Sequence, residues 1–184
     1  MEYTVKIGGE AGQGIQTIGD TLAKVFSRAG YHVFTHQDYE SRIRGGHNFY
    51  QIRFSDKPVS ASREHIDILV ALDRESITLH EKELTQNGRI IYDSATLKQT
   101  REESHFLDIP FVRLALDNGG DKIMANAAAT GAVMGMLGVE LSIFLEMIKD
   151  AFRKKGEGII QANAATAMAG YDFGVKHCTQ CSFS

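Results

Sequence analysis

Residues 3–15 read Tyr-Thr-Val-Lys-Ile-Gly-Gly-Glu-Ala-Gly-Gln-Gly-Ile. The alternation of side chains up to Ile7 predicts a β-strand, and from Ile15 to Ala29 apolar residues recur every three or four positions, which predicts an α-helix. A strand that enters a helix through a glycine-rich turn is typical of α/β units that bind nucleotides. We therefore expect the fold to be built around this strand, turn and helix.

The turn itself contains Gly8, Gly9, Gly12, Gln13 and Gly14. Glycine adopts backbone angles that other residues avoid and lets a ligand approach the main chain, and the free N–H groups of the next helix favour an anion. The spacing G-G-x-x-G-x-G is not G-x-G-x-x-G, so the usual NAD fingerprint is absent. The same residues would also suit a tight turn that binds nothing.

Further alternation and periodicity place the remaining elements along the chain. Strands are predicted at 31–35, 48–54, 67–72, 89–93 and 111–114, and helices at 74–86, 122–137, 141–154 and 159–173. Asn87-Gly88 is expected to close the helix of 74–86, and 94–108 to be irregular. Strands that alternate with helices predict an α/β fold, a single Rossmann-like domain over 1–184 with a mostly parallel sheet flanked by helices and a frayed tail at 175–184.

The composition excludes several classes of protein. A net charge of -3 argues against general binding to nucleic acid. No basic and apolar leader opens the sequence, and no run reaches the roughly 20 apolar residues of a membrane span. The two cysteines, Cys178 and Cys181, lie at the end, so a cytoplasmic location is expected.

A second candidate site lies in the polar segment 36–48, which contains Arg42, Arg44, Gly45 and Gly46. Guanidinium groups make paired, charged hydrogen bonds with phosphate or carboxylate, which favours an anionic ligand here. Acidic residues in the same segment leave open an internal cluster of ion pairs. A contact with another subunit is a third interpretation, because arginine and tyrosine are common at interfaces.

Other patterns indicate structure more than chemistry. The single C-x-x-C of Cys178 and Cys181 is at most half a metal site, so no metal ligand is predicted. The histidines are scattered and G-x-S-x-G is absent, so no catalytic residue is assigned. The Ala- and Gly-rich stretch 125–138 predicts a closely packed helix in the core or at a subunit contact.

Taken together, residues 8–15 and 39–48, followed by Asn126 and Gly131, resemble the gamma subunit or domain of 2-oxoacid:ferredoxin oxidoreductases. The residues of these motifs are most similar to the type in which the gamma domain is fused ahead of the alpha domain, a type often specific for 2-oxoglutarate. The resemblance extends from about residue 3 to about residue 174 of the chain. The sequence ends at Ser184, which leaves open whether this is a free subunit or a piece of such a fused chain.

The resemblance implies a division of labour. The complete enzymes decarboxylate a 2-oxoacid of the pyruvate or 2-oxoglutarate type with thiamine diphosphate, pass electrons through iron–sulfur clusters to ferredoxin, and transfer the acyl group to coenzyme A. Thiamine diphosphate and the clusters belong to the alpha and beta partners, and the gamma domain to the coenzyme A side. On this resemblance the residues that bind coenzyme A or line an interface are Gly8, Gly9, Gly12, Gln13, Gly14, Arg42, Arg44, Gly45 and Gly46. The isolated chain is expected to be inactive and to self-associate, for instance as a homodimer.

Two alternatives stay open. One is a stand-alone nucleotide-binding enzyme, for which an acidic residue after the second strand would bind a ribose, and Asp38 is near that place. The other is a purely structural subunit whose loops bind only protein. The sequence does not identify the 2-oxoacid.

Overall fold

A computed structural model describes residues 1–40 and 46–178 of the chain. Contacts within the chain divide it into two compact units, Met1–Asp108 and Ile109–Ser184. The single domain over 1–184 stays a prediction. The last turn of the final helix includes residues 175–177, and the rest of the expected frayed tail from 179 lies outside the described residues.

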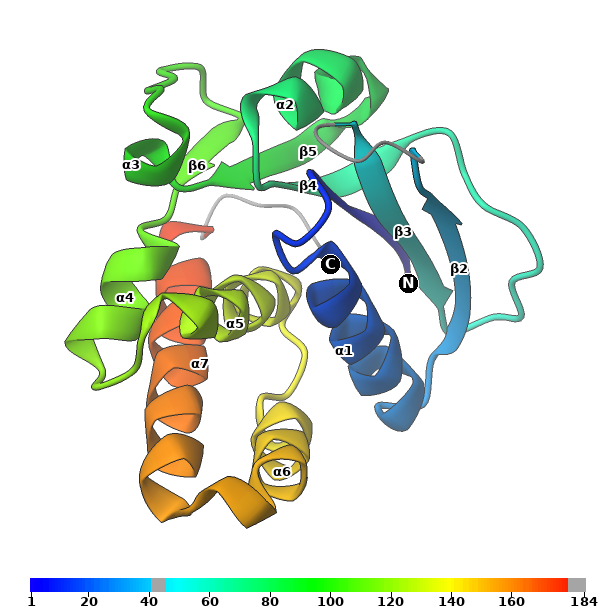
Figure 1. The fold of residues 1–184 in the computed structure, drawn as a ribbon. Helices are drawn as coiled ribbons and strands as arrows, with labels where there is room; N and C mark the ends of the chain where they lie inside the picture. Colours follow the sequence, from blue (N-terminus) through cyan, green and yellow to red (C-terminus); the bar gives the residue numbers. More distant parts are fainter. Residues whose placement is uncertain (41–45, 179–184) are drawn as a thin grey trace. The chain divides into compact units, whose positions relative to one another are not determined.

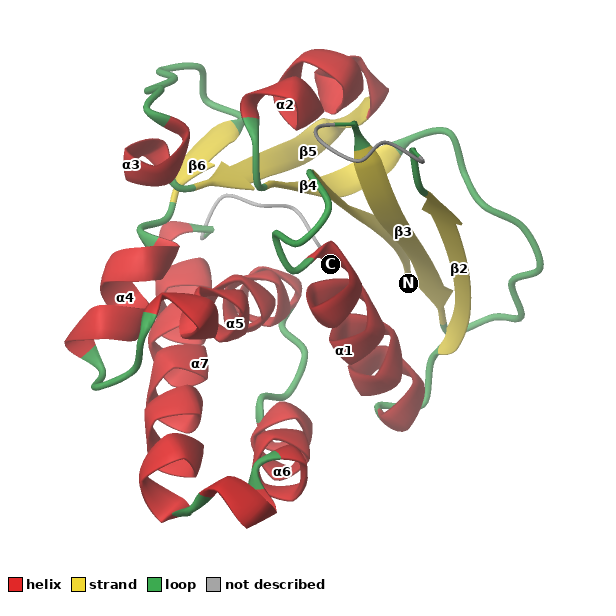
Figure 2. Cartoon of the chain, in the orientation of Figure 1, coloured by secondary structure: helices red, strands yellow, loops and turns green. Residues whose placement is uncertain are grey.

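The first unit contains one six-stranded sheet in the order β2-β3-β1-β4-β5-β6. Its elements are β1 Glu2–Gly9, α1 Ile15–Arg28, β2 His32–Asp38, β3 Asn48–Ser55, β4 Ile66–Ala71, α2 Arg74–His80, the 3₁₀ helix η1 Glu81–Glu83, β5 Leu84–Tyr92, α3 Ser94–Leu97 and β6 Phe106–Asp108. β1, β4, β5 and β6 pair in parallel, and β3 is antiparallel to both of its neighbours. The predicted α/β class with a mostly parallel sheet is therefore confirmed (Figure 2).

The helices α1 and α2 lie on opposite faces of this sheet (Figure 1). On one face, Gly19 of α1 lies against the ring of Tyr50 on β3, and a Cβ there would be 2.3 Å from the ring. On the other face, Ser76 of α2 lies against Gly8 of β1. Because side chains alternate along a strand, Lys6 faces α2 as Gly8 does.

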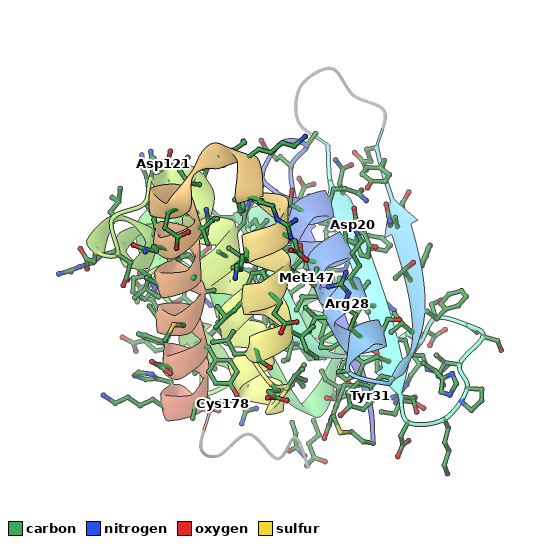
Figure 3. The ribbon with its side chains drawn as sticks, turned by 90° about the horizontal axis from the view of Figure 1, so that it is seen from below. Asp20, Arg28, Tyr31, Asp121, Met147 and Cys178 are labelled. Carbon is green, nitrogen blue, oxygen red and sulfur yellow. The ribbon has the colours of Figure 1, made fainter. Side chains whose placement is uncertain are left out.

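The predicted apolar stripe of α1 is buried against the sheet. Its buried residues are Ile15, Ile18, Gly19, Leu22, Val25 and Phe26. Phe26 stacks on Phe54 of β3 with ring centroids 3.9 Å apart. Asp20, labelled on α1 in Figure 3, accepts a hydrogen bond from the Tyr50 hydroxyl (2.9 Å). Burial and this bond raise the pKa of Tyr50 to about 12, so the phenol stays neutral and fixes α1 to β3.

The second unit is helical. It contains α4 Phe111–Asp117, η2 Lys122–Met124, α5 Ala125–Leu137, α6 Ser142–Ala151, η3 Arg153–Lys155 and α7 Glu157–His177. α5 and α7 run in the same direction and touch through Gly131, Gly135, Gly170 and Gly174, where a Cβ would lie 2.1–2.4 Å from a carbonyl oxygen of the facing helix. Residues 127–137 of α5 are buried, so the Ala- and Gly-rich stretch is core, one of its two expected roles.

The predicted strand at 111–114 is wrong, because these residues form the start of α4. Pro110 precedes them with a φ of -78°, which suits the beginning of a helix, and its missing N–H disfavours the middle of a sheet. A short apolar run cannot be assigned to strand or helix by periodicity alone. The sixth strand is β6, inside the stretch 94–108 that we expected to be irregular and that also holds α3.

The predicted helix 74–86 is too long. α2 ends at His80, and Asn87-Gly88 does not close a helix but lies inside β5. The pairing of β4 with β5 shifts between Ile66 and Ile68, whose partners are Leu84 and Arg89. The extra residues of β5 fall at this irregularity, which explains a glycine inside a strand. Among the described residues, no helix is long and apolar enough to cross a membrane.

Candidate functional site

The glycine turn lies where the connections of the sheet change direction. The chain leaves β1 through α1 on one face and continues to β2 and β3, whereas it leaves the adjacent β4 through α2 on the other face and continues to β5. Leu72, just after β4, donates its N–H to the Gly8 carbonyl (2.9 Å) and joins the two strand ends. Open α/β sheets bind ligands outside the carboxyl ends of strands at such a point.

Two glycines of the turn are required by backbone conformation. Gly12 and Gly14 have φ angles of 87° and 92°, which disfavour other side chains. Gln13 stabilises the turn from within: its Oε1 accepts the N–H of Glu10 (2.7 Å), and its Nε2 donates to the Leu72 carbonyl (3.3 Å). The amide of Gln13 is thus engaged by the turn and by the end of β4, and its contact with a ligand stays a prediction.

The start of α1 is open to an anion. Its N-cap is Gly14, no side chain of the described residues caps the helix, and no acidic residue lies in its first turn. The first N–H groups of a helix have no partner in the helix and carry partial positive charge. A Cβ on Gly12 would have no atom of the described residues within 4 Å. Shape and charge therefore fit a phosphate here better than a cation.

The second predicted segment reaches the same edge of the sheet. Arg42, Arg44 and Gly45 lie outside the described residues. The residues on either side of them are described. Tyr39 donates its hydroxyl to the side chain of Gln16, in the first turn of α1. Gly46, with a φ of 104°, leads into β3, whose first residue Asn48 pairs with Gly9.

This convergence follows from the direction of β3. In the structure, the antiparallel β3 begins where β1 ends, so the chain must return beside the glycine turn. Glu40 is hydrogen-bonded to the two residues around the start of β3. Its N–H donates to Asn48 Oδ1 (2.8 Å), and its carboxylate accepts the N–H of His47 (3.2 Å).

Below the turn, on the α2 face, four side chains form a buried network that the sequence did not indicate. Lys6, only 4% exposed, donates to Glu83 Oε2 (2.5 Å) and lies 3.3 Å from His80 Nδ1. His80 Nδ1 is 3.0 Å from the same carboxylate oxygen, and His80 Nε2 is 2.6 Å from His47 Nε2. The sequence feature that could have indicated this network is Lys6, a lysine among the apolar residues of a buried strand.

The electrostatics of this network follow from burial. Burial lowers the pKa of His80 below its ordinary value, more than the hydrogen bond with Glu83 raises it. Burial raises the pKa of Glu83, but hydrogen bonds from Lys6 and His80 outweigh this effect and hold it below its ordinary value. At neutral pH the network therefore contains one ammonium, one carboxylate and a neutral His80.

Carboxylates at neighbouring strand ends serve the fold. Asp73 Oδ1 accepts the N–H of Ser76 (2.8 Å) and caps α2, and Asp93 accepts the N–H groups that begin α3. Asp38, the candidate for a ribose, is exposed at the end of β2. Because β3 lies between β2 and β1, Asp38 is not on the strand next to the glycine turn, as the ribose-binding acid of a dinucleotide fold would be.

The chain matches the family described as pyruvate ferredoxin/flavodoxin oxidoreductase over residues 4–173. It is 31% identical over 175 residues to ketoisovalerate oxidoreductase subunit VorA of Methanothermobacter thermautotrophicus, covering 94% of this chain and 36% of that protein. It is 28% identical to 2-oxoglutarate synthase subunit KorC of Archaeoglobus fulgidus, covering 86% of this chain and 83% of that subunit.

Two solved structures share the fold. One is a 2-oxoglutarate:ferredoxin oxidoreductase from Magnetococcus marinus with 2-oxoglutarate, coenzyme A and succinyl-CoA bound. Its TM-score is 0.84 at 24% identity, and the match covers 31% of that chain. A gamma subunit of a keto/oxoacid ferredoxin oxidoreductase from Geobacter sulfurreducens has a TM-score of 0.77 at 23% identity and is covered to 98%. The chain thus spans about a third of some relatives and nearly all of others.

Proposed function

The chain belongs to the pyruvate ferredoxin/flavodoxin oxidoreductase family, and from this premise we propose that it is the gamma component of a 2-oxoacid:ferredoxin oxidoreductase. Its role is to hold coenzyme A for acyl transfer, with 2-oxoglutarate or pyruvate as the class of 2-oxoacid. Alpha and beta partners carry thiamine diphosphate and the iron–sulfur clusters, and ferredoxin takes the electrons. Subunits of similar length in this family, such as KorC, support a small separate component.

The observation that carries the proposal is the uncapped start of α1 at the switch point of the sheet. The pyrophosphate of coenzyme A binds at the N–H groups that follow Gly14, and Gly12 leaves space for it. Arg42 and Arg44, on the segment that returns beside Gly9, supply positive charge to the same phosphates. The chain binds and orients the thiol carrier and contributes no proton donor or acceptor to the reaction.

Calorimetry with the full chain tests the ligand. We expect coenzyme A to bind and pantetheine, which lacks the phosphates, not to bind. Gly12→Val places a branched side chain in the turn and should hinder the binding of coenzyme A sterically. Arg44→Ala removes a positive charge and should weaken the binding of coenzyme A by about 1–3 kcal/mol, or about 5- to 150-fold. Arg113→Ala, at an exposed ion pair of α4, is the matched control and should have no effect. Equal binding of pantetheine would exclude phosphate recognition.

Reconstitution tests the assembly. The isolated chain should reduce neither ferredoxin nor a viologen dye with any 2-oxoacid, and added alpha and beta partners should give turnover. In that complex, Arg44→Ala should raise the Michaelis constant for coenzyme A and leave that for the 2-oxoacid unchanged. Turnover by the chain alone would support a stand-alone enzyme. If Arg44→Ala instead prevents assembly and leaves coenzyme A binding intact, the segment is an interface and the chain is a structural subunit.

Partner binding has a candidate surface in the second unit. Five large apolar side chains are exposed among the described residues of this unit: Leu116, Ile123, Ile159, Met168 and Val175. Met168 and Val175 are seven residues apart and lie on one side of α7. Exposed apolar groups of this kind support contacts with other subunits and self-association in isolation. Light scattering at high concentration tests this, and a clean monomer would count against it.

A further inference from the structure

The contact between His47 and His80 links the residue just before β3 to the end of α2, on the face of the sheet that α2 covers. His47 follows Gly46 directly, and its ring lies against β1, where a Cβ on Gly8 would be 3.3 Å from Cε1 of His47. His80, at the end of α2, fixes this ring through the 2.6 Å contact between the Nε2 atoms. Both histidines are buried, at 7% and 6% exposure.

This contact requires a specific proton count. One Nε2 must donate a proton and the other must accept it with a lone pair. When His80 donates from Nδ1 to Glu83, its Nε2 is the acceptor, and His47 donates. His47 Nδ1, which is buried and has no hydrogen-bond partner among the described residues, then carries a lone pair and no proton. This arrangement satisfies every N–H of the two rings while both rings are neutral.

An added proton disrupts the arrangement wherever it binds. On His80 it would place two N–H groups against each other at the contact with His47. On His47 it would create a buried N–H at Nδ1 without an acceptor, which is costly. In either case a new positive charge would stand in the network that already holds Lys6.

We propose that His80 is a positioning residue for the glycine turn: through a one-proton contact it holds His47, and with it the start of β3, against Gly8 and Gly9, and acid pH releases this contact. This inference goes beyond the proposed function and does not depend on coenzyme A.

The other charged groups around the pair define the direction of the pH effect. From β1, Lys6 opposes protonation of His80, and from η1, Glu83 favours it. From the segment before β3, Glu40 binds the backbone N–H of His47. From β2, His36 contacts the ring of Phe49, which also touches both buried histidines. Burial dominates at His80, so the contact is intact at neutral pH and is lost as the pH falls.

Nuclear magnetic resonance of the full chain between about pH 7.5 and pH 5 tests the proposal. We expect the amide signals of Gly8, Gly9 and Asn48 to shift together with the ring signals of His47 and His80, at a midpoint below about 6.5, the ordinary histidine value. His80→Gln should keep the neutral-pH spectrum of the turn and abolish this transition. His65→Gln, at an exposed histidine just before β4, is the matched control and should leave the transition unchanged.

The proposal is overturned if the ring of His80 titrates while the three amides stay still, or if the amide transition persists in His80→Gln. If His80→Gln does not fold, His47→Gln decides on the same criteria. Its side-chain amide can donate to neutral His80 and turn to accept from protonated His80, so acid should no longer release the contact. A purely structural role would lower stability in these variants without changing the pH dependence of the turn.

Discussion

Glycine serves opposite purposes in the two units of this chain. Between α5 and α7, a Cβ on Gly131 or Gly170 would lie 2.2 or 2.1 Å from a carbonyl oxygen of the facing helix, so glycine is needed because no space exists. At the turn, Gly12 has free space and a φ of 87°, so glycine is needed because of conformation. The helix pair is made of backbone packed on backbone, and the turn keeps its backbone accessible.

Gly170→Ala should have the largest effect. The new methyl group would meet the carbonyl of Ala128, which belongs to a helix backbone and cannot move aside. We expect a loss of about 3 kcal/mol in the free energy of unfolding, at the upper end for overpacking. Urea denaturation followed by circular dichroism measures it. A loss below about 0.5 kcal/mol would mean that the helices separate without cost.

Gly12→Ala should cost less, about 1–2 kcal/mol, since only the left-handed backbone is strained. Gly12→Asn sharpens the comparison, because asparagine tolerates this conformation and the site has space. We expect Asn to recover part of the stability at position 12 and none at position 170. The same denaturation assay compares the four variants, and equal losses for Ala and Asn at position 12 would contradict conformation as the cause.

Part of the pH dependence of folding stability should come from His80, in the network of the first unit. Because the pKa of His80 is lowered in the folded protein, the unfolded chain binds more protons, and stability is lost as the pH falls through the ordinary histidine value of about 6.5 toward the folded one. Melting temperatures at about pH 7.5 and pH 5.5 should therefore differ more in the wild type than in His80→Gln. Identical differences would remove His80 as the source.

Gly158→Ala should have the smallest effect and the opposite sign. Gly158 is in the first turn of α7, where a Cβ would meet nothing within 4 Å, and its φ is not positive. Alanine should raise stability by about 0.4–1 kcal/mol, since it restricts the unfolded chain. This variant is the control for Gly170→Ala in the same helix. Destabilisation would show that α7 is intolerant of alanine for another reason.

Much of the fold could be predicted from local patterns, because α1 has an apolar residue every three or four positions and β4 is a nearly continuous apolar run. The errors fall where a pattern is short or interrupted. Residues 111–114 are four apolar-rich positions that suit either element, and Pro110 was the deciding signal. The glycine within β5 looks like a helix end until its pairing with β4 is known. Such pairing depends on residues far apart in the sequence.

The candidate site was predicted in part. Gly12 and Gly14 have the positive φ angles that a glycine-rich turn implies, and the turn joins the first strand to the first helix as predicted. The buried network could not be predicted, because Lys6, His47, His80 and Glu83 come from four elements and approach only in the folded chain. Within the local sequence, this network is indicated by Lys6, a lysine in an otherwise apolar strand.

The side-chain amide of Gln13 gives the glycine turn its shape before any ligand arrives. It links the N–H of Glu10 to the carbonyl of Leu72 and so ties a flexible, glycine-rich stretch to a rigid strand end. Ordering such a stretch on binding would oppose association, by roughly 1–2 kcal/mol for each residue fixed. In this protein that entropy is lost during folding instead. If coenzyme A binds in the turn as proposed, its phosphates meet a preorganised backbone, and more of their interaction energy contributes to affinity.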